Sequence, residues 1–265
     1  MLFRSRRSCC HTLRASLNSR RASNGAKSLI ATVMTTEVAQ SAAQDLRELG
    51  FVTLPDVLSP TQCDAVIRRV EANGVAGAGS RNLLDQPWCQ SLAIRMKDDP
   101  RIGPLLPAQA VAVQCTLFEK SAADKNWLVV LHQDLSIPVK NKVESLECSG
   151  WSEKEGGLFV QPPAAVLESL VAVRVHLDEC GLQNGPLRVV PGSHRHGRLR
   201  APETQQRRRD QGEHVCASPR GGALLLKPLL LHASSKSTTA ARRRVLHFLY
   251  GSRELPCQLQ WRHAI

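Results

Sequence analysis

Residues Trp127–Leu135 read WLVVLHQDL, an apolar run that ends in a histidine and an aspartate two positions apart. In an extended strand, alternate side chains point to the same face and lie about 6.6 Å apart along the backbone. His132 and Asp134 can therefore project side by side. An imidazole nitrogen and a carboxylate oxygen are two of the three ligands of the facial triad that binds non-haem Fe(II). A lone His-x-Asp also fits ordinary hydrogen bonds at a strand end, so the metal hypothesis depends on a third ligand elsewhere.

A second apolar stretch supplies a candidate for that ligand. Residues Leu224–Leu231 form a strand-like run, interrupted at Lys227-Pro228, which leads into His232. Strands that are distant in sequence pair as neighbours in a jelly roll, so this histidine can meet the earlier pair. Three facial protein ligands would leave two positions for a bidentate 2-oxo acid and one for dioxygen.

The strand that follows begins with Arg242-Arg243-Arg244. Only one face of a strand can point inward, so if Arg243 points in, Arg242 and Arg244 point out. A planar guanidinium forms a bidentate, charge-assisted pair with a carboxylate, which suits the far carboxylate of 2-oxoglutarate. The sequence predicts the strand but not its phase, and Arg244 remains an alternative to Arg243.

Helical patterns occupy the first part of the chain and short β-type runs occupy the rest. Apolar spacing predicts a helix that ends at Gly50, a strand at 51–54, and a helix that begins at Ser59-Pro60. The later predicted strands are 111–118, 128–131, 158–160, 170–177, 187–190, 223–226 and 245–250. This order predicts a mainly-β jelly roll buttressed by N-terminal helices.

The charge of the chain is unevenly distributed. The 265 residues carry a formal net charge of +12, but residues 1–36 hold seven basic residues and no acidic one. Without those seven, 28 basic residues face 23 acidic ones, so the remainder is only mildly basic and no nucleic-acid partner is expected. The leader is rich in Arg, Ser and Ala, which predicts a disordered organelle transit peptide. A basic nucleic-acid-binding arm is the alternative.

Targeting and partners follow from the same features. The leader predicts a mitochondrial protein, with a plastid as the alternative, or a cytoplasmic one if translation starts at Met34. Nine scattered cysteines without a CxxC pair indicate reduced thiols rather than a disulfide scaffold. No apolar run is long enough to predict a membrane span. The sequence carries no signal for an oligomeric state.

Taken in order, the motifs of the chain resemble the phytanoyl-CoA dioxygenase family of Fe(II)/2-oxoglutarate-dependent oxygenases. The resemblance extends from about Gly50 to the C-terminus. The segments that carry it are Phe118-x-Lys120, Asn126-Trp127-x-Val129, His132-Gln133-Asp134-Leu135, Val160-Gln161-Pro162-Pro163, Arg174-x-His176-Leu177-Asp178, Asn184-Gly185-Pro186-Leu187-Arg188-Val189, Pro191-Gly192-Ser193-His194-Arg195-x-Gly197, His232-x-Ser234 and Arg243-Arg244-Val245.

The resemblance implies one oxygenase domain, residues 37–265, built on a double-stranded β-helix of the cupin type. It implies that His132, Asp134 and His232 bind Fe(II) and that Arg243 binds 2-oxoglutarate. Dioxygen would be the other co-substrate, and an unidentified small or lipid-like molecule would be hydroxylated with release of succinate and CO2. Related halogenases replace the carboxylate of the His-x-Asp motif with Gly or Ala, so Asp134 favours hydroxylation.

The same resemblance suggests four further residues that line the co-substrate pocket. They are Gln114, Ser234, Trp151 and Arg81. Each has a structural alternative: Gln114 as a strand surface residue, Ser234 in a loop hydrogen bond, Trp151 in the core and Arg81 in solvent. The chain departs from the family pattern at Leu131, a position where many bacterial-type relatives carry tryptophan. The leucine would give the pocket wall a different shape.

Two other classes of function remain open from the residues alone. One is a different metal-dependent cupin-type enzyme that does not use 2-oxoglutarate; the arginine after the distal histidine argues against it. The other is a non-catalytic jelly-roll binding module that uses the leader and Arg207-Arg208-Arg209 on nucleic acid, although that run is expected to be a solvated loop. Among the remaining histidines, His247 is expected to be an ordinary strand residue, while either His176 or Arg174 could point inward.

Overall fold

The structure is a computed structural model that describes residues 39–72, 74 and 79–265. The chain divides into two compact units, residues 1–42 and 43–265, and the second of these is considered below. The predicted transit peptide and Met34 lie outside the described residues, so organelle targeting stays a prediction. None of the helices in the described ranges has the length and apolarity needed to cross a membrane.

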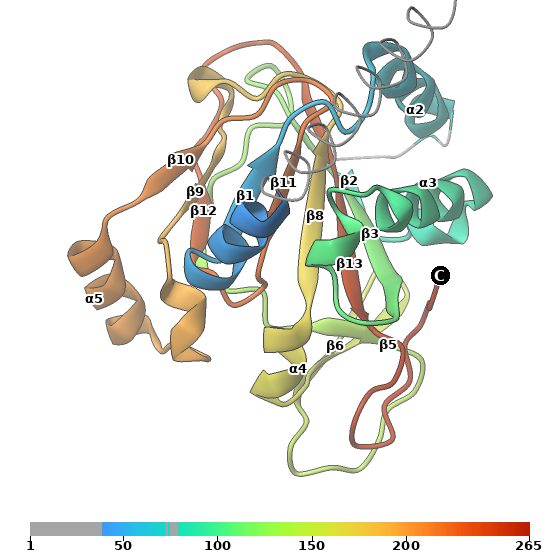
Figure 1. The fold of residues 1–265 in the computed structure, drawn as a ribbon, viewed down its shortest axis with the longest axis vertical. Helices are drawn as coiled ribbons and strands as arrows, with labels where there is room; N and C mark the ends of the chain where they lie inside the picture. The colour runs from blue at the N-terminus through green and yellow to red at the C-terminus, as the bar shows by residue number, and fades with distance from the viewer. Residues whose placement is uncertain (1–38, 73, 75–78) are drawn as a thin grey trace, which may run out of the picture. The chain divides into compact units, whose positions relative to one another are not determined.

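Three antiparallel sheets form the second unit (Figure 1). The largest has the strand order β1-β11-β8-β13-β3-β2. Its strands are β1 (Phe51–Leu54), β2 (Gly79–Ser80), β3 (Ala110–Lys120), β8 (Val171–His176), β11 (Ala223–Leu226) and β13 (Arg243–Ser252). The second sheet has the order β10-β9-β12-β4, with β4 (Val129–His132), β9 (Leu187–Val189), β10 (His214–Cys216) and β12 (His232–Ser234). The third has the order β5-β7-β6, with β5 (Ile137–Val139), β6 (Ser149–Lys154) and β7 (Gly157–Gln161).

The hydrophobic core is formed by residues of all three sheets. Its members include Val189 of β9, Leu224 of β11, Ile137 of β5 and Val160 of β7, each at most 1% exposed. Sheets that share one apolar interior in this way define a jelly roll, so the predicted mainly-β fold class is confirmed. The inner face of the largest sheet also carries charged residues, which form part of the site described below.

After β1, the described residues form four α-helices: α2 (Pro60–Ala72), α3 (Pro87–Asp98), α4 (Ala164–Ser169) and α5 (Ala201–Gln211). A further helix, residues 39–48, precedes β1, as predicted for the segment that ends at Gly50. The helix predicted to begin at Ser59-Pro60 is α2, and Ser59 caps it: its Oγ accepts from the backbone N of Gln62 at 3.3 Å, and its own N donates to Gln62 Oε1 at 2.8 Å. This reciprocal pair satisfies two N–H groups that a helix start leaves unpaired.

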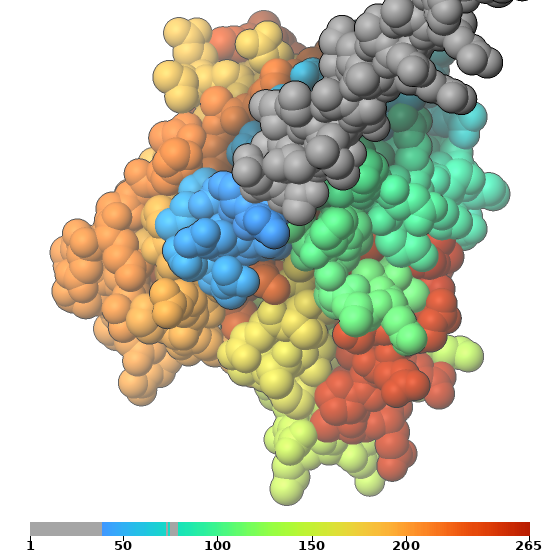
Figure 2. All heavy atoms as spheres, in the orientation of Figure 1, coloured from blue at the N-terminus to red at the C-terminus, as the bar shows by residue number. Residues whose placement is uncertain are grey.

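Helix α3 covers the outer face of the largest sheet. Tyr250 of β13 is buried, and its hydroxyl donates to the backbone carbonyl of Ala93 at 2.8 Å. The C-terminus returns to the same sheet, because Ile265 and Ala112 exchange two backbone hydrogen bonds. Figure 2 shows the C-terminal residues, in red, lying beside the green residues of this region. Strands β3 and β13 are therefore buried on both faces.

The run Arg207-Arg208-Arg209 lies in α5 rather than in the expected loop. The sequence has no apolar periodicity here because this helix buries only Thr204. Polar pairs stabilise it instead: Arg200 N donates to Glu203 Oε2 at 2.7 Å, and Gln206 Nε2 donates to Asp210 Oδ1 at 2.7 Å. A prediction based on apolar periodicity cannot detect a helix that is stabilised by such polar contacts.

The predicted strand 224–231 contains most of β11 and then a turn, and β12 begins after it. Strand β11 ends at Leu226, and Leu230 N donates to the Lys227 carbonyl at 3.0 Å before β12 begins at His232. Pro228 cannot donate to a neighbouring strand, so the interruption ends the first strand. Strands β5, β6 and β10 were not predicted, since short or polar segments such as Ser149–Lys154 carry little alternation.

Replacement of Tyr250 by phenylalanine tests the contact between α3 and the large sheet. The variant keeps the ring but leaves the Ala93 carbonyl without its second donor, so we expect Tyr250→Phe to lower the free energy of unfolding by about 1 kcal/mol. Urea titration followed by circular dichroism measures this loss. Leu146→Ala, at a fully exposed position, is the control and should change stability little. An unchanged urea midpoint in Tyr250→Phe would contradict the assigned role.

Candidate metal centre

The pairing of β12 with β4 brings the predicted metal ligands together. These strands run antiparallel, with His232 directly opposite His132. Asp134 follows β4 by two residues, and its backbone N donates to the Pro228 carbonyl at 2.9 Å. The turn before the distal histidine therefore also positions the carboxylate. One cross-strand register places three residues, two of them about a hundred positions from the third, around one point.

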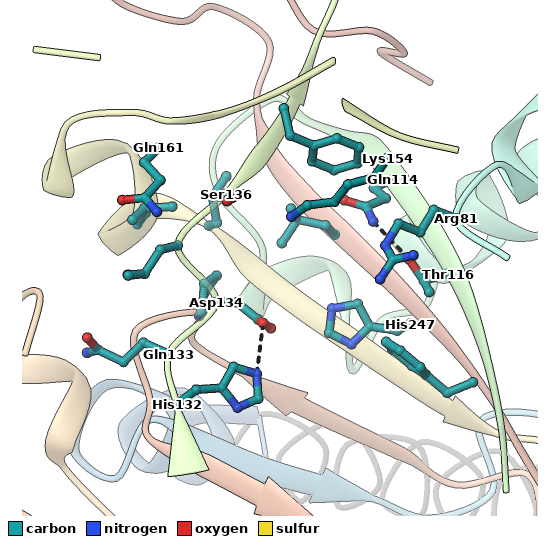
Figure 3. A pocket seen from close by; sticks show the side chains of 17 residues that line it. Arg81, Gln114, Thr116, His132, Gln133, Asp134, Ser136, Lys154, Gln161 and His247 are labelled. Atoms are coloured by element: carbon teal, nitrogen blue, oxygen red, sulfur yellow. Dashed lines mark hydrogen bonds and ion pairs between the residues drawn. The ribbon is translucent and has the colours of Figure 1, made fainter. Parts of the chain in front are cut away.

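The donor atoms of these three residues lie within 4.8 Å of one another. Asp134 Oδ1 is 3.5 Å from His132 Nε2, and Asp134 Oδ2 is 3.7 Å from His232 Nε2. Figure 3 shows His132 and Asp134 pointing toward each other into a cavity. His232 is 5% exposed, whereas the side chains of His132 and Asp134 are partly accessible. Two imidazoles and one carboxylate that converge in this way can bind a divalent transition metal.

Hydrogen bonds to the backbone orient both imidazole rings. His132 Nδ1 lies 2.8 Å from the Val130 carbonyl, and His232 Nδ1 lies 2.8 Å from the Leu230 carbonyl. A carbonyl only accepts, so each Nδ1 carries the hydrogen and each Nε2 presents its lone pair to the centre. Such outer hydrogen bonds are characteristic of histidines that bind metals.

The three side chains shift one another's pKa values. Burial opposes ionisation of Asp134, but the imidazoles of His232 and His132 outweigh it and hold the pKa of this carboxyl well below its ordinary value. Burial likewise lowers the pKa of His132, but the hydrogen bond to Asp134 outweighs it and the pKa is raised. Burial lowers the pKa of His232. The carboxylate is therefore ionised at neutral pH, as a metal ligand must be.

Gln133 fixes the backbone between the histidine and the aspartate. Its Nε2 donates to the carbonyls of Gly197 at 2.8 Å and Leu229 at 2.7 Å, and its Oε1 accepts from Leu199 N at 2.8 Å. The buried amide thus connects the motif to two other segments of the chain. No role was predicted for Gln133 from the sequence, although it lies between the histidine and the aspartate of the motif.

Two cavities adjoin the triad. The larger has a volume of about 410 Å³ and the smaller about 210 Å³, and both are lined by His132, Asp134, Arg81, Phe118 and His247. The larger extends along β6 and β7, and the smaller continues past His232 to Ser234 and Arg243. The candidate metal position therefore lies where two binding spaces meet.

Arg243 lines the smaller cavity and is 3% exposed. Its Nη1 donates to the Gly185 carbonyl at 2.7 Å, while its buried Nε has no acceptor among the described residues. A buried donor without a partner costs free energy, which a bound carboxylate would recover. The structure thus places Arg243 in the wall of the cavity that adjoins the triad, and its role as a co-substrate anchor stays a prediction.

The neighbouring arginines are engaged elsewhere. Arg244 donates from Nε and Nη2 to Asp178, at 2.8 Å each, and also pairs with Glu71. Arg242 pairs with Glu119 and Glu71, and its side chain is 47% exposed. These carboxylates fix the phase of β13, so Arg244 is not available to the cavity.

Ser234 also lines the smaller cavity, where it belongs to a hydrogen-bonded chain. Lys120 Nζ donates to Ser234 Oγ and to the Ser235 carbonyl at 2.7 Å each, and Ser234 Oγ donates to the Gly185 carbonyl at 2.9 Å. Gly185 therefore receives both this hydroxyl and the Arg243 guanidinium. Ser234 therefore lines the cavity, as one interpretation predicted, and also forms structural hydrogen bonds, as the alternative predicted.

Arg174 and His247 form a pair that the sequence did not predict. Arg174 Nη1 lies 3.0 Å from His247 Nδ1, and its guanidinium stands 5.2 Å from the centre of the Phe118 ring. Burial lowers the pKa of Arg174 to about 10 and that of His247 to about 3. The imidazole is therefore neutral: it accepts from the arginine at Nδ1 and carries its hydrogen on Nε2. The sequence did hold one indication of where His247 points: positions 243 and 247 are an even number of residues apart, so they lie on the same face of one strand.

The other predicted pocket residues have different outcomes. Gln114 lines the larger cavity and donates to Thr116 Oγ1 at 2.8 Å, and Arg81 lines both cavities. Trp151 lines neither cavity; it packs against the core cluster, in agreement with the structural alternative. Leu131 is also absent from both linings, so the structure does not support its proposed effect on the pocket wall.

Residues 46–245 match the family model of phytanoyl-CoA dioxygenase (PhyH). Because the match covers most of the chain, this protein belongs to that family. A comparison with curated protein sequences gave no match.

Solved structures of other proteins share the fold of this chain. The epimerase SnoN from nogalamycin biosynthesis, described as non-heme and alpha ketoglutarate dependent, superposes with a TM-score of 0.61 at 15% identity over 82% of each chain. EctD from S. alaskensis with bound Fe gives a TM-score of 0.58 at 18% identity over 79% of this chain and 75% of that one. HygX from Streptomyces hygroscopicus with iron bound gives 0.55 at 19% identity, over 80% and 86%. At these identities the likeness establishes the fold.

The buried Lys120 predicts a specific pH dependence of stability. Burial, with repulsion from Arg243 and Arg174, lowers its pKa to about 8. Between about pH 8 and the ordinary lysine pKa, about 10.4, the unfolded chain binds more protons at this position, so its contribution to stability rises with pH. We expect the unfolding free energy of the wild type, minus that of Lys120→Met, to increase across this window.

Urea titrations at a series of pH values measure this difference. Lys140→Met, at an exposed lysine, is the matched control and should show no such trend. A difference between wild type and Lys120→Met that does not vary with pH would mean that the amine is not buried as described.

Proposed function

We propose that this protein is an Fe(II)- and 2-oxoglutarate-dependent dioxygenase that hydroxylates a small molecule. The observation that carries the proposal is the smaller cavity, which joins the His132–Asp134–His232 triad to the buried guanidinium of Arg243. Membership of the phytanoyl-CoA dioxygenase family supports it. Structures of similar fold include EctD described with 2-oxoglutarate and SnoN described with Fe3+ and alpha ketoglutarate.

The side chains of the triad fit Fe(II). Both Nε2 atoms present lone pairs, and the carboxylate is held ionised by the adjacent imidazoles. Two histidines and one carboxylate on one face of a metal leave its other positions accessible, an arrangement characteristic of non-haem Fe(II) oxygenases. His132, Asp134 and His232 would therefore bind the metal.

The smaller cavity fits a dicarboxylate. Arg243, Arg174 and the Lys120 amine lie at or behind its wall, and none of them forms an ion pair with a described carboxylate. Buried cations of this kind require an anion for electrostatic balance. Arg243 would bind the far carboxylate through its free Nε, with the Ser234 hydroxyl beside it.

Bound Fe(II) supplies the redox chemistry that activates dioxygen. In the proposed reaction, substrate C–H, 2-oxoglutarate and dioxygen give substrate C–OH, succinate and CO2. The protein contributes position and charge: Arg243 orients the co-substrate, and the larger cavity holds the substrate against the triad. His247, which contacts Arg174, borders both cavities. Asp134 would bind the metal where a halide ion would otherwise need room, which favours hydroxylation over halogenation.

The direct test of co-substrate binding is spectroscopic. Protein loaded with Fe(II) in the absence of oxygen should develop the weak visible charge-transfer band of a metal-chelated 2-oxo acid when 2-oxoglutarate is added. His132→Ala should abolish the band, because a metal ligand is lost. Arg243→Ala should leave a band but raise the Kd for 2-oxoglutarate about 10- to 100-fold, because a buried charge-assisted pair is lost.

Arg242→Ala is the matched control, since its guanidinium points to Glu119 and Glu71 rather than into the cavity. It should bind 2-oxoglutarate as the wild type does. Iron binding without the band would favour a cupin-type enzyme that does not use 2-oxoglutarate. Failure to bind iron would refute the metal centre.

Catalysis depends on the carboxylate as well as on the imidazoles. We expect Asp134→Ala to abolish the formation of succinate from 2-oxoglutarate, measured by mass spectrometry after incubation with Fe(II) in air. Succinate formation at the wild-type rate would refute the assignment of this ligand. Leu128→Ala, at an exposed position just before β4, controls for damage to this region and should retain succinate formation.

A further inference from the structure

The larger cavity contains positive charge that the proposed co-substrate does not use. Two cations line it, Arg81 and Lys154, and among the described residues the one carboxylate in its lining is Asp134, already assigned to the metal. Figure 3 shows Arg81 and Lys154 on the same side of the cavity, beside Gln114 and Thr116. Arg243, which fits the co-substrate, lines the other cavity.

Glu155 forms an ion pair with Arg81 and positions its side chain. Arg81 Nη1 donates to Glu155 Oε1 at 2.7 Å, and its backbone N donates to Oε2 at 2.7 Å. Glu155 does not line either cavity, so it fixes one edge of the guanidinium while Arg81 still borders both spaces. The arginine is therefore preorganised, and its remaining donors can bind a ligand without loss of side-chain freedom.

Lys154 is the residue next to this carboxylate in sequence, yet it forms no ion pair. Its Nζ lies 4.9 Å from the centre of the Phe159 ring, and among the described residues no carboxylate oxygen lies within 4.0 Å of it. Burial lowers the pKa of this amine and repulsion from Arg81 lowers it further, while Asp134 raises it. Both cations line the same cavity. A partly buried ammonium and an exposed guanidinium that line the same cavity form an arrangement that an anion stabilises.

About half of the remaining lining is apolar. These side chains include Leu135, Phe159, Leu167, Leu170 and Leu249. A volume of about 410 Å³ is typical of a site for a small molecule. A small number of polar groups in such a site fix the orientation of a ligand, while the apolar side chains bind its body.

We propose that Arg81 and Lys154 bind the anionic group of the substrate, which is a small organic acid with a carboxylate or phosphate head and an apolar body. The inference rests on the proposed function, because it takes the larger cavity as the substrate site of an oxygenase. The head group is held on the side of Arg81, Gln114 and Thr116, and the body extends across the leucines, with a C–H bond presented to the triad. The cations thus determine which end of the substrate approaches the metal.

Three probes of equal chain length separate charge from hydrophobicity: octanoate, octyl phosphate and the neutral octanamide. Each is titrated calorimetrically into the full chain, loaded with Fe(II) and 2-oxoglutarate without oxygen. We expect at least one anion to bind about tenfold more tightly than the amide. Lys154→Gln should weaken binding of that anion about tenfold and leave the amide unaffected, while Lys154→Arg should restore it. The preferred anion distinguishes a carboxylate from a phosphate head.

Lys140→Gln is the matched control, since this lysine is exposed and lines neither cavity. It should bind all three probes as the wild type does. Equal binding of amide and anions, no binding of either anion, or an unaffected Lys154→Gln variant would overturn the inference. The charge-transfer band, recorded on the same samples before titration, reports separately on the proposed function: if it is absent, that function fails, and if it is present without anion preference, only the substrate class fails.

Discussion

The antiparallel contact between His132 and His232 is the constraint on which the site depends. Because β4 and β12 hold these residues directly opposite each other, the two imidazoles and Asp134 converge without any long loop to position them. A shift of one residue in this register would turn one histidine to the other face of its strand. The carbonyls of Val130 and Leu230 then complete the arrangement by fixing which nitrogen of each ring is free. Register and tautomer together define the metal position.

The inner face of the largest sheet is the second determinant, and its chemistry is unusual for a strand interior. Arg174, Lys120 and Arg243 lie on three adjacent strands among apolar side chains. Their charges are moderated by a neutral imidazole, a hydroxyl and backbone carbonyls rather than by carboxylates. Without a bound anion, these buried cations lower the stability of the fold, and they favour the binding of an anion. Fold stability and ligand affinity are therefore opposed at these positions.

The sequence was sufficient for the parts of the site that depend on periodicity. His132, Asp134 and His232 followed from strand alternation and jelly-roll pairing, and the main strands were found within a few residues of their ends. The choice of Arg243 over Arg244 required Asp178 and Glu71, which are distant in sequence. Arg174 and His247 were not assigned because a charged residue in a buried strand gives no local sign of the side it faces. Helix α5 was missed because it has almost no apolar face. Trp151 was predicted to line the co-substrate pocket but packs against the core, because a motif transfers less safely away from the metal.

Strand β4, which carries the first of the metal ligands, lies at the edge of its sheet and pairs there only with β12. Leu128 and Val130 on its exposed side are 56% and 69% accessible. An edge strand with such a surface frays more readily than an interior one and offers unpaired backbone groups to other chains. A metal bound to the triad would link β4 to β12 through two imidazoles and so hold this edge strand to its neighbour. Metal binding at this site would therefore also stabilise the edge of the sheet against fraying and against pairing with other chains.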